Sequence, residues 1–312
     1  MDWISRRRRL LVIYNPTAGL NMSGFHMGGR GKRARLEAYL DLLEEAGCAV
    51  EFRPTAKRGD AQAFAAEGLS ERYDAVVAAG GDGTIGEVAN GLPAENAAPL
   101  GIFPLGTANV LAAEIGLPLQ PSAVLRAVLQ GPAREIYPGY LGNNLQPERL
   151  FTIMAGVGFD AHVVADLPLR LKRLLGKGAY VWQSLALLAR WQGNEYRLRL
   201  DGGEAVSCAS AVIAKGHFYG GRFVCCPDAR LDAPDFQICL FGKPGRWGAA
   251  RAMAMLPLGQ LQRLPEIRLL RARQVEIEGP ADDPVQADGD IAGRLPLSAW
   301  VAEKPLRLIY PA

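Results

Sequence analysis

The 312-residue chain is poor in the residues that build metal and redox centres. Its five cysteines form no C-x-x-C pair, and its three histidines lie far apart in the sequence. This spacing argues against a zinc site and a disulfide framework, so the cysteines are expected to be small core residues in a reducing compartment. The sequence also lacks H-E-x-x-H and G-x-S-x-G patterns, which argues against a metalloprotease and a serine hydrolase.

Long apolar runs are missing too, although hydrophobic residues make up 49% of the chain. No run approaches the roughly 18 residues that a membrane-spanning helix needs. The basic block at residues 6–9 precedes an apolar run of only residues 10–14, which is too short for the core of a signal peptide. The net charge of +3 indicates no general affinity for nucleic acid. We therefore expect a cytoplasmic protein with no nucleic-acid partner.

The first part of the chain alternates between strand and helix patterns. Strands are predicted at residues 10–15, 48–55, 73–81 and 99–106, and helices at residues 32–47, 60–70, 84–91 and 108–116. This alternation predicts a doubly wound α/β domain, whose parallel sheet has helices on both faces and binds ligands at the carboxyl ends of its strands. Residues 20–32 are rich in glycine and are predicted to form a flexible loop, in which Arg30, Lys32 and Arg33 can contact phosphates.

Strands joined by turns dominate the second part of the chain. They are predicted at residues 134–143, 149–156, 195–202, 205–216, 236–242 and 273–279, and one long helical segment interrupts them at residues 169–192. We predict an antiparallel β-sandwich for this part. The expected domains are residues 1–133 and 134–300, with residues 301–312 packing back on the first domain.

The loop GDGTIG at residues 81–86 follows the third predicted strand and matches the G-x-G-x-x-G pattern. A dinucleotide-binding loop would instead follow the first strand, with an acidic residue about 20 positions later. Asp82 would also repel a pyrophosphate unless a cation lay between them, which favours a phosphate site linked through Mg²⁺. A further interpretation is a plain turn in which Asp82 or Thr84 caps the following helix.

Short polar loops also follow the neighbouring predicted strands. Asn15 opens the sequence NPTAG after the first strand, Thr55 ends the second strand, and Thr107 and Asn109 lie in PLGTAN after the fourth. Because the carboxyl ends of parallel strands share one edge of a sheet, we expect these loops to form a single anion-binding crevice. The sequence has no Walker A motif, since the nearest match, at residues 24–32, has Arg30 where the motif needs lysine.

Taken together, these motifs resemble a known family. NPTAG, GGDGTIGEV with Asn90-Gly91, and PLGTAN resemble, in that order, the diacylglycerol kinase and sphingosine kinase superfamily, and most closely its soluble bacterial members. The resemblance continues through AGVGFDAHV, LKRLLGKGAYVWQSL and VQADGD, and so spans nearly the whole chain. It implies an ATP- and Mg²⁺-dependent lipid kinase that phosphorylates a lipid hydroxyl, such as that of diacylglycerol. Its nucleotide-binding domain would be similar to those of NAD kinases and phosphofructokinases, and its β-sandwich would bind the lipid.

The resemblance also implies roles for individual residues. The residues implied to contact ATP are Asn15, Thr55, Gly80, Gly81, Asp82, Gly83, Thr84, Ile85, Gly86, Thr107 and Asn109. Asp290 matches the catalytic base that accepts the proton of the lipid hydroxyl. Asp82 would take part in catalysis by holding Mg²⁺ or ordering its water, and Asp232 and Asp235 flank the expected place of a second, structural Mg²⁺.

Some positions depart from the family's pattern. Asp290 stands where the family has glutamate, and a displacement of about 1 Å can lower a rate about 100-fold. Ala233 and Pro234 occupy the turn where the family shows a DDG-like sequence, so one carboxylate ligand of the structural Mg²⁺ is missing. Val110 follows PLGTAN, where an aspartate or a similar polar residue is usual.

These departures leave alternatives open. One is a catalytically weak regulator that binds nucleotide or lipid, and another is a kinase for a soluble hydroxyl such as that of NAD, because NAD kinases share GGDGT. The segment at residues 169–192 combines apolar side chains with a basic cluster. It is predicted either to pack on the sandwich or to contact the membrane surface that presents the lipid. No motif specifies the particular lipid or the oligomeric state.

Overall fold

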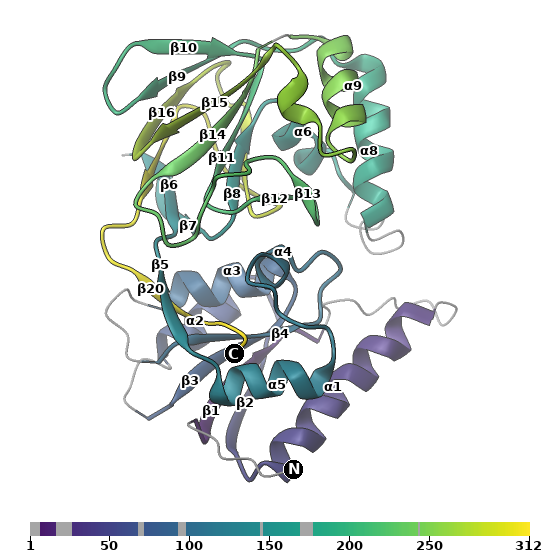
Figure 1. Ribbon diagram of the computed structural model, residues 1–312, viewed down its shortest axis with the longest axis vertical. Coiled ribbons are helices and arrows are strands. Elements are labelled where there is room, and N and C mark those ends of the chain that lie inside the picture. Colours follow the sequence, from purple (N-terminus) through teal and green to yellow (C-terminus); the bar gives the residue numbers. More distant parts are fainter. Residues whose placement is uncertain are drawn as a thin grey trace. The chain divides into compact units, whose positions relative to one another are not determined.

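The computed structural model describes residues 7–16, 27–67, 72–92, 98–143, 146–168, 177–242 and 244–312. The chain divides into two compact units (Figure 1). The first unit comprises residues 1–136 and 304–312, and the second comprises residues 137–303. The C-terminal segment therefore belongs to the same unit as the N-terminal part of the chain.

The first unit is built on a six-stranded sheet with the order β2-β1-β3-β4-β20-β5. Its strands are β1 (Arg9–Tyr14), β2 (Ala49–Pro54), β3 (Ala75–Gly80), β4 (Leu100–Pro104), β5 (Ala133–Ile136) and β20 (Leu306–Ile309). Its helices are α1 (Met27–Glu45), α2 (Asp60–Glu67), α3 (Asp82–Gly91), α4 (Val110–Glu114) and α5 (Pro121–Gln130). The first five strands of this order pair in parallel, and β5 pairs with β20 in antiparallel orientation.

The strand order places a topological switch at the end of β1. The chain passes from β1 to β2 on one side, and β3 pairs with β1 on the other side. Helix α1 packs against α5, while α2 packs against α3, as expected for helices that cover opposite faces. Every residue of β3 is buried, which fits a central parallel strand covered on both faces. In such sheets the loops after the two strands at the switch open a crevice for ligands.

Helix α1 begins earlier than the sequence predicted. Its first residue is Met27, so the prediction of a loop up to residue 32 is wrong for residues 27–32. The residues that follow are strong helix formers, and a helix once nucleated propagates at low cost, even though each glycine costs about 1 kcal/mol relative to alanine. The remaining part of the predicted loop, residues 20–26, and the side chains of Arg30, Lys32 and Arg33 lie outside the described residues.

The second unit contains two six-stranded antiparallel sheets. One has the order β10-β9-β16-β19-β6-β7, formed by β6 (Gly139–Asn143), β7 (Gln146–Phe151), β9 (Tyr196–Leu200), β10 (Ala205–Cys208), β16 (Gln274–Glu278) and β19 (Leu297–Val301). The other has the order β15-β14-β11-β8-β17-β18, formed by β8 (Met154–Val157), β11 (Ser210–Ala214), β14 (Phe236–Phe241), β15 (Ile267–Ala272), β17 (Pro284–Ala287) and β18 (Asp290–Arg294). A short hairpin joins β12 (Phe218–Tyr219) to β13 (Phe223–Val224).

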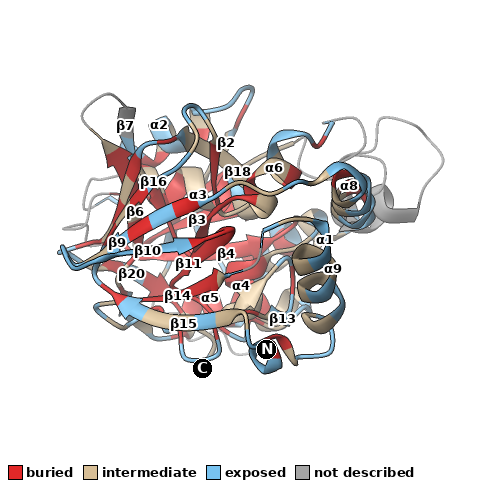
Figure 2. Ribbon diagram, turned by 90° about the horizontal axis from the view of Figure 1, so that it is seen from above, coloured by how far each residue is buried: buried red, intermediate tan, exposed pale blue. Residues whose placement is uncertain are grey.

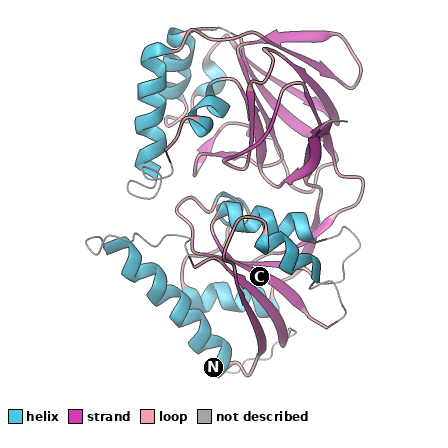
Figure 3. Cartoon of the chain, turned by 180° about the vertical axis from the view of Figure 1, so that it is seen from behind, coloured by secondary structure: helices cyan, strands magenta, loops and turns pink. Residues whose placement is uncertain are grey.

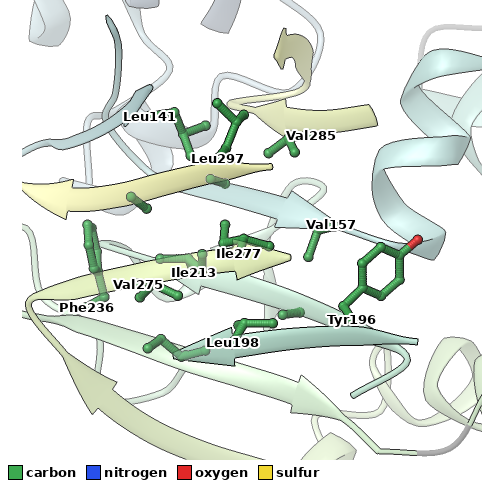
Figure 4. Packing of buried hydrophobic residues seen from close by; sticks show 14 of the residues in the cluster. Leu141, Val157, Tyr196, Leu198, Ile213, Phe236, Val275, Ile277, Val285 and Leu297 are labelled. Carbon is green, nitrogen blue, oxygen red and sulfur yellow. The ribbon is translucent and has the colours of Figure 1, made fainter. Parts of the chain in front are cut away.

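The two six-stranded sheets share one hydrophobic core (Figure 4). Leu198, Ile277 and Leu297 contribute to it from the first sheet, and Ile213 and Val285 from the second, all of them buried. Removing this much apolar surface from water supplies most of the driving force for packing one sheet on the other. The predictions of a parallel α/β domain followed by an antiparallel β-sandwich are thus confirmed.

Some predicted strands are divided between different sheets. The segment at residues 134–143 forms β5 of the first unit and β6 of the second, interrupted by Tyr137 and Pro138. The segment at residues 205–216 forms β10 and β11, which belong to opposite sheets of the sandwich. The chain crosses between these sheets at Ala209, a buried residue with no turn signal in the sequence. Because β-propensity is continuous across this segment, the sequence does not show that the chain passes from one sheet to the other, which only packing determines.

Three helices of the second unit lie side by side along one edge of the sandwich (Figures 1 and 3). They are α6 (Phe159–Ala165), α8 (Lys177–Arg190) and α9 (Arg246–Met255), and a 3₁₀ turn, η1 (Leu261–Arg263), follows α9. Helix α8 packs against both α6 and α9, and much of the surface of α8 and α9 is exposed (Figure 2). Within the described residues, the model contains no helix with the length and apolar character needed to cross a membrane.

Candidate functional site

The loops after β3 and β4 contact each other backbone to backbone. The Gly106 amide donates a 3.1 Å hydrogen bond to the carbonyl oxygen of Gly80. A Cβ atom on Gly106 would lie 2.3 Å from the Gly81 Cα, and one on Gly80 would lie 2.5 Å from the Thr84 Oγ1. Gly106 is therefore required by the close approach of the two loops, and Gly80 by the Thr84 side chain that lies against it.

Asp82 links these two loops through its side chain. It is the first residue of α3, and its Oδ1 atom accepts a 2.6 Å hydrogen bond from the backbone amide of Val110, the first residue of α4. The residue that caps α3 is Gly81, and no side chain among the described residues bonds to that cap. The interpretation of Asp82 or Thr84 as the cap of α3 is therefore wrong, because Asp82 bonds to the start of a different helix.

Asn15 joins the end of β1 to the same place. Its backbone amide donates to the carbonyl oxygen of Ala79 at 3.2 Å, and its Nδ2 atom donates to the Oγ1 atom of Thr84 at 3.3 Å. The Thr55 amide donates to the carbonyl oxygen of Tyr14 at 2.8 Å, which holds the end of β2 beside the end of β1. The structure thus brings together the residues that the sequence predicted at the ends of β1, β2 and β3.

The residues of α3 differ in what they offer a ligand. Gly83 is exposed at the start of the helix, whereas the Ile85 side chain is 1% exposed and the Ile85 amide bonds to the carbonyl oxygen of Gly81. The amides of the first helical turn have no partner within a helix, so the N-terminus of α3 is suited to bind an anion. Ile85 serves the core of the unit, and Gly86 lies beyond this first turn.

The loop after β4 contributes one exposed and one half-buried polar side chain. Thr107 is exposed, while Asn109 adopts a left-handed backbone with φ of 49°. The Asn109 Nδ2 atom donates a 2.9 Å hydrogen bond to the Gly106 carbonyl oxygen, which fixes the orientation of the amide. Its Oδ1 atom is buried and has no hydrogen-bond partner among the described residues. An unsatisfied buried acceptor of this kind fits a donor supplied by water or a ligand.

The DGD sequence forms a tight turn between β17 and β18 in the second unit. Asp288 and Gly289 have φ angles of 49° and 84°, as a two-residue hairpin turn requires. The Asp288 carboxylate accepts hydrogen bonds from the amides of Thr152, Ile153 and Met154 at 2.7, 2.9 and 3.0 Å. Burial raises the pKa of Asp288, and these backbone bonds act in the opposite direction. Asp288 therefore anchors the turn to the start of β8.

Asp290 follows this turn as the first residue of β18. Its Oδ2 atom lies 3.8 Å from the guanidinium Nη2 of Arg149, and the Asp290 side chain is 36% exposed. Arg149 also donates a 2.8 Å hydrogen bond to the Ile291 carbonyl oxygen. The predicted base is therefore accessible and lies next to a cation that the sequence did not single out.

The other two predicted metal ligands are bonded to arginines. Asp232 receives two 2.9 Å hydrogen bonds from Arg230, which lower the pKa of its carboxyl group. Asp235 receives hydrogen bonds of 3.1 and 3.2 Å from the Nη1 atom of Arg271. In the sheet order, three strands separate β14, which follows Asp235, from β18, which begins with Asp290. These carboxylates and the predicted base therefore do not form one cluster.

Two family models match the chain. The model of the diacylglycerol kinase catalytic domain matches residues 9–141, and the model of the YegS C-terminal NAD kinase beta sandwich-like domain matches residues 153–310. The chain belongs to the diacylglycerol kinase catalytic domain family. It also carries a YegS-like C-terminal domain. The family is the one that the resemblance of its motifs predicted.

The chain is similar over almost its whole length to diacylglycerol kinases from bacteria. Those from Staphylococcus aureus strains JH9 and Newman are each 28% identical over 310 residues, which cover 98% of this chain and 93% of the relative. A crystal structure from Bacillus anthracis strain Sterne superposes with a TM-score of 0.79 at 20% identity, covering 98% of this chain and 96% of its own. A crystal structure of a diacylglycerol kinase from the same strain gives a TM-score of 0.75 at 20% identity. These two structures support the two-domain fold.

The loops at the ends of β3 and β4 fit the Mg²⁺–nucleotide complex that the kinase family implies. A Mg²⁺ ion that binds ATP usually takes one or two protein carboxylates and completes its octahedron with phosphate oxygens and water. Asp82 supplies one such carboxylate beside the N-terminus of α3. The buried, unsatisfied Oδ1 atom of Asn109 supplies an acceptor for a hydroxyl group or water nearby. The donor set is therefore appropriate for a metal shared between protein and phosphates.

The predicted second metal site does not fit the residues that are present. Lys215 is fully buried, and its Nζ atom donates hydrogen bonds to the carbonyl oxygens of Ala233 and Asp235. Burial lowers the pKa of Lys215 to about 8, while the Asp235 and Asp232 carboxylates act against that change. An ammonium group at these carbonyl oxygens would repel a metal cation. No cluster of three or more His, Cys, Asp or Glu side chains suited to a metal occurs among the described residues.

Sequence reasoning missed Lys215, Arg149 and Asp288. The Asp-Gly pair of the turn was a usable signal for a hairpin, because both residues tolerate a left-handed backbone. Lys215 ends an apolar strand pattern, but its carbonyl partners lie 18 and 20 residues away and carry no side-chain signature. The role of such a lysine depends on backbone atoms that only the folded loop presents.

Proposed function

We propose that this protein is an ATP- and Mg²⁺-dependent lipid kinase that transfers the γ-phosphoryl group of ATP to a hydroxyl of diacylglycerol or a related lipid. The observation that carries the proposal is the Asp82 carboxylate, which lies at the start of α3 and bonds to the first amide of α4 at 2.6 Å. One acid thereby links the glycine loop after β3 to the helix that follows the loop after β4. Membership of the diacylglycerol kinase family supports phosphoryl transfer, and the 28% identity to bacterial diacylglycerol kinases supports a lipid acceptor.

The nucleotide is proposed to bind at the carboxyl edge of the first sheet. Its phosphates would lie over the backbone amides at the start of α3, where the helix dipole favours negative charge. Gly83 has no side chain that would keep a phosphate away from the backbone. Asn15 and Thr84, which are hydrogen-bonded to each other, place polar side chains beside it. Thr107 and Asn109 extend the same edge from the loop after β4.

The proposed reaction forms a bond between the lipid hydroxyl oxygen and the γ-phosphorus of ATP. The bond from the γ-phosphorus to the bridging oxygen breaks, and that oxygen leaves with the electron pair as part of ADP. Asp290 is proposed to accept the proton that the lipid hydroxyl releases. Backbone amides of α3 stabilise the charge on the phosphates. When it is bound, Mg²⁺ neutralises charge on the β- and γ-phosphate oxygens.

Helix α8 supplies a surface suited to a membrane that presents the lipid. Ala179, Gln183 and Leu187 are buried against the unit, whereas Trp182 and Leu185 are 62% and 53% exposed on the opposite face. Exposed large apolar side chains on one helix face are unusual in a purely packed helix. This pattern supports a membrane-contacting role for α8, while residues 169–176 of the predicted segment, with Arg170, Lys172 and Arg173, lie outside the described residues.

Helix α9 extends this surface. Trp247 is 74% exposed, and the guanidinium carbon of Arg246 lies 5.5 Å from the centroid of its ring. A hollow of about 550 Å³ lies where α8 ends and α9 begins; it is lined by Ala189, Arg190, Trp191, Gln192, Gly245, Arg246 and Trp247. Tryptophan and arginine together suit the interface of an anionic bilayer, where the ring meets lipid and the cation meets headgroups. We propose a peripheral contact of α8 and α9 with the cytoplasmic side of a membrane.

The test is an assay with γ-labelled ATP and Mg²⁺, in which diacylglycerol in mixed micelles and soluble NAD are offered as separate acceptors. We expect label in the organic-soluble product with diacylglycerol and no transfer to NAD. Label in NAD alone would replace the lipid kinase by a kinase for a soluble hydroxyl. Binding of ATP and lipid with no labelled product would favour a regulator.

A further inference from the structure

The turn that carries Asp290 is held by a second set of bonds besides those of Asp288. Gln286 lies on β17, four positions before Asp290, and its side chain is fully buried. Its Oε1 atom accepts a 3.0 Å hydrogen bond from the backbone amide of Gly289. Its Nε2 atom donates a 2.6 Å hydrogen bond to the Oδ2 atom of Asp160 on α6. A buried amide thus connects helix α6 to the residue that directly precedes Asp290.

The Asp160 carboxyl group is held in turn by a third side chain. Its Oδ1 atom accepts a hydrogen bond from the hydroxyl group of Tyr219 on β12. Burial raises the pKa of Asp160 to about 6, while the bonds from Tyr219 and Gln286 lower it. Each of its two oxygens accepts a hydrogen bond from a fixed donor, which is the bonding expected of an ionised carboxylate. The bonds run without interruption from Tyr219 through Asp160 and Gln286 to Gly289.

The chemistry of the two ends permits only one orientation of the Gln286 amide. An ionised carboxylate only accepts hydrogen bonds, and a backbone amide only donates them. The Gln286 nitrogen must therefore face Asp160, and its oxygen must face Gly289. A reversed amide would place two acceptors together at one end and two donors at the other, at a side chain that is itself fully buried.

Gly156 on β8 leaves the space that this arrangement needs. A Cβ atom there would lie 2.5 Å from the Asp160 Oδ2 and 2.8 Å from the Gln286 Nε2. Gly156 is also the residue of β8 that faces Gln286 in the strand pairing. The carboxylate and the amide therefore lie directly against the backbone of β8, which restricts both side chains to one position.

We propose that Asp160 and Gln286 are positioning residues for phosphoryl transfer, which fix the Gly289 peptide and thereby the direction of the Asp290 carboxylate. The inference rests on the proposed function, in which Asp290 accepts the proton of the lipid hydroxyl. Asp288 anchors the turn to β8 through the amides of residues 152–154. The amide of the peptide between residues 288 and 289 donates instead to Gln286, which therefore orients that peptide. A rotation of that peptide redirects the next side chain, and a shift of about 1 Å at a reacting group can cost about 100-fold in rate.

The sharpest test replaces Gln286 with methionine, an unbranched side chain of similar length that makes neither bond. Gln286→Met is expected to lower kcat for lipid phosphorylation about 10- to 100-fold while KM for ATP changes less than about twofold. The matched control is Gln237→Met. Gln237 is a buried glutamine of β14 that also makes two hydrogen bonds, with the amide and carboxylate of Asp228 at 2.8 and 3.1 Å. The control loses comparable bonds in the same sheet and is expected to keep the wild-type kcat.

A milder variant covers the case in which Gln286→Met does not fold. Asp160→Asn keeps the shape of the side chain and one acceptor oxygen, and the Tyr219 hydroxyl can rotate to accept from the new amide. The bond to Gln286 then changes from charge-assisted to neutral and weakens. We expect kcat of Asp160→Asn to lie between those of the wild type and Gln286→Met. Equal kcat values for Gln286→Met and Gln237→Met, or a wild-type kcat in both Asp160→Asn and Gln286→Met, would overturn the positioning role.

Hydrogen exchange of the Gly289 amide separates this inference from the proposed function. Its protection is expected to fall at least about tenfold in Gln286→Met and to stay unchanged in Gln237→Met, because only the first variant removes its acceptor. Unchanged protection in Gln286→Met contradicts the inference whatever the activity. If the wild type transfers no phosphoryl group to lipid, the proposed function and the positioning role fail together. Lost protection would then show only that Gln286 holds the turn.

Discussion

The carboxylate of Asp82 accepts a hydrogen bond of 2.6 Å from the backbone amide of Val110, 28 residues later in the chain. The bond ties the loop after β3 to the helix that follows β4, so one side chain sets the spacing of two glycine loops. The motif resemblance implies a polar residue where Val110 stands, yet the contact uses the backbone of Val110. The loss of a polar side chain there therefore leaves this link intact.

Replacement of Asp82 by asparagine is expected to lower kcat/KM for ATP at least about 100-fold, because the variant loses both a charge for Mg²⁺ and a charge-assisted bond. The matched control is Asp74→Asn. Asp74 accepts 2.8 Å hydrogen bonds from the amides of Arg8 and Arg9, at the opposite end of β3. Steady-state kinetics with varied ATP would measure both variants. An equal loss in the two would show that Asp82 acts only through stability.

Asp290→Asn is expected to reduce lipid phosphorylation at least about 100-fold and to leave the affinity for ATP unchanged, since an amide cannot accept the hydroxyl proton. Glu276→Gln serves as its control, because Glu276 is an exposed carboxylate that also pairs with an arginine, Arg199, at 3.3 Å. Titration of ATP binding and single-turnover kinetics would separate binding from chemistry. Full activity in Asp290→Asn would remove this residue from the role of base.

The loop held by Lys215 is expected to be stable without metal. In the absence of nucleotide, the melting temperature should differ by less than about 1 °C between EDTA and excess Mg²⁺, because the ammonium group already bonds to the carbonyl oxygens of Ala233 and Asp235. Lys215→Met should lower the free energy of unfolding, since it leaves both carbonyl groups without this donor. A rise of several degrees with Mg²⁺ that disappears in Asp232→Asn would contradict this account.

Stability should depend on pH through Asp160. Its pKa is raised from 3.8 to about 6 by burial, so the folded state binds a proton more tightly than the unfolded state does. This tighter proton binding stabilises the folded state fully below about pH 3.8, and the stabilisation is lost as the pH rises toward 6. Asp160→Asn does not ionise there. The difference between the two free energies of unfolding, variant minus wild type, should therefore increase by up to about 3 kcal/mol as the pH rises from acidic to neutral. Denaturant unfolding at pH values below and above this window measures the difference, and a constant difference would contradict the assignment.

Membrane contact should depend on the exposed tryptophans of α8 and α9. Trp182→Ser combined with Trp247→Ser is expected to lower the binding of the protein to anionic vesicles about tenfold or more and to leave ATP binding unchanged. Leu119→Ser is the control, since Leu119 is an exposed apolar residue, at 63%, in the first unit. Sedimentation with vesicles of phosphatidylglycerol and phosphatidylcholine measures the partition. Equal binding of the double variant and the control would place the contact elsewhere.

The local sequence pattern was sufficient to predict much of the fold and the positions of the glycine loops. The strands of the first unit alternate with helices, and Asn15, Asp82 and Asn109 each follow a strand of the same parallel sheet, whose ends share one edge. These features depend on residues a few positions apart, so the sequence alone shows them. The sandwich was predictable as a class in the same way, from strands that are joined by turns.

Tertiary structure alone decided which distant groups meet. Asp160 and Gln286 are 126 residues apart, and the bond between them exists because β17 pairs with β8 beside α6. Lys215 bonds to backbone carbonyl oxygens, which look alike in every sequence until a loop is folded around them. Ala209 gives no sign that the chain crosses between sheets there. Hydrogen bonds and burial of this kind depend on the packing of whole sheets, whereas motifs and periodicity record only what neighbouring residues do.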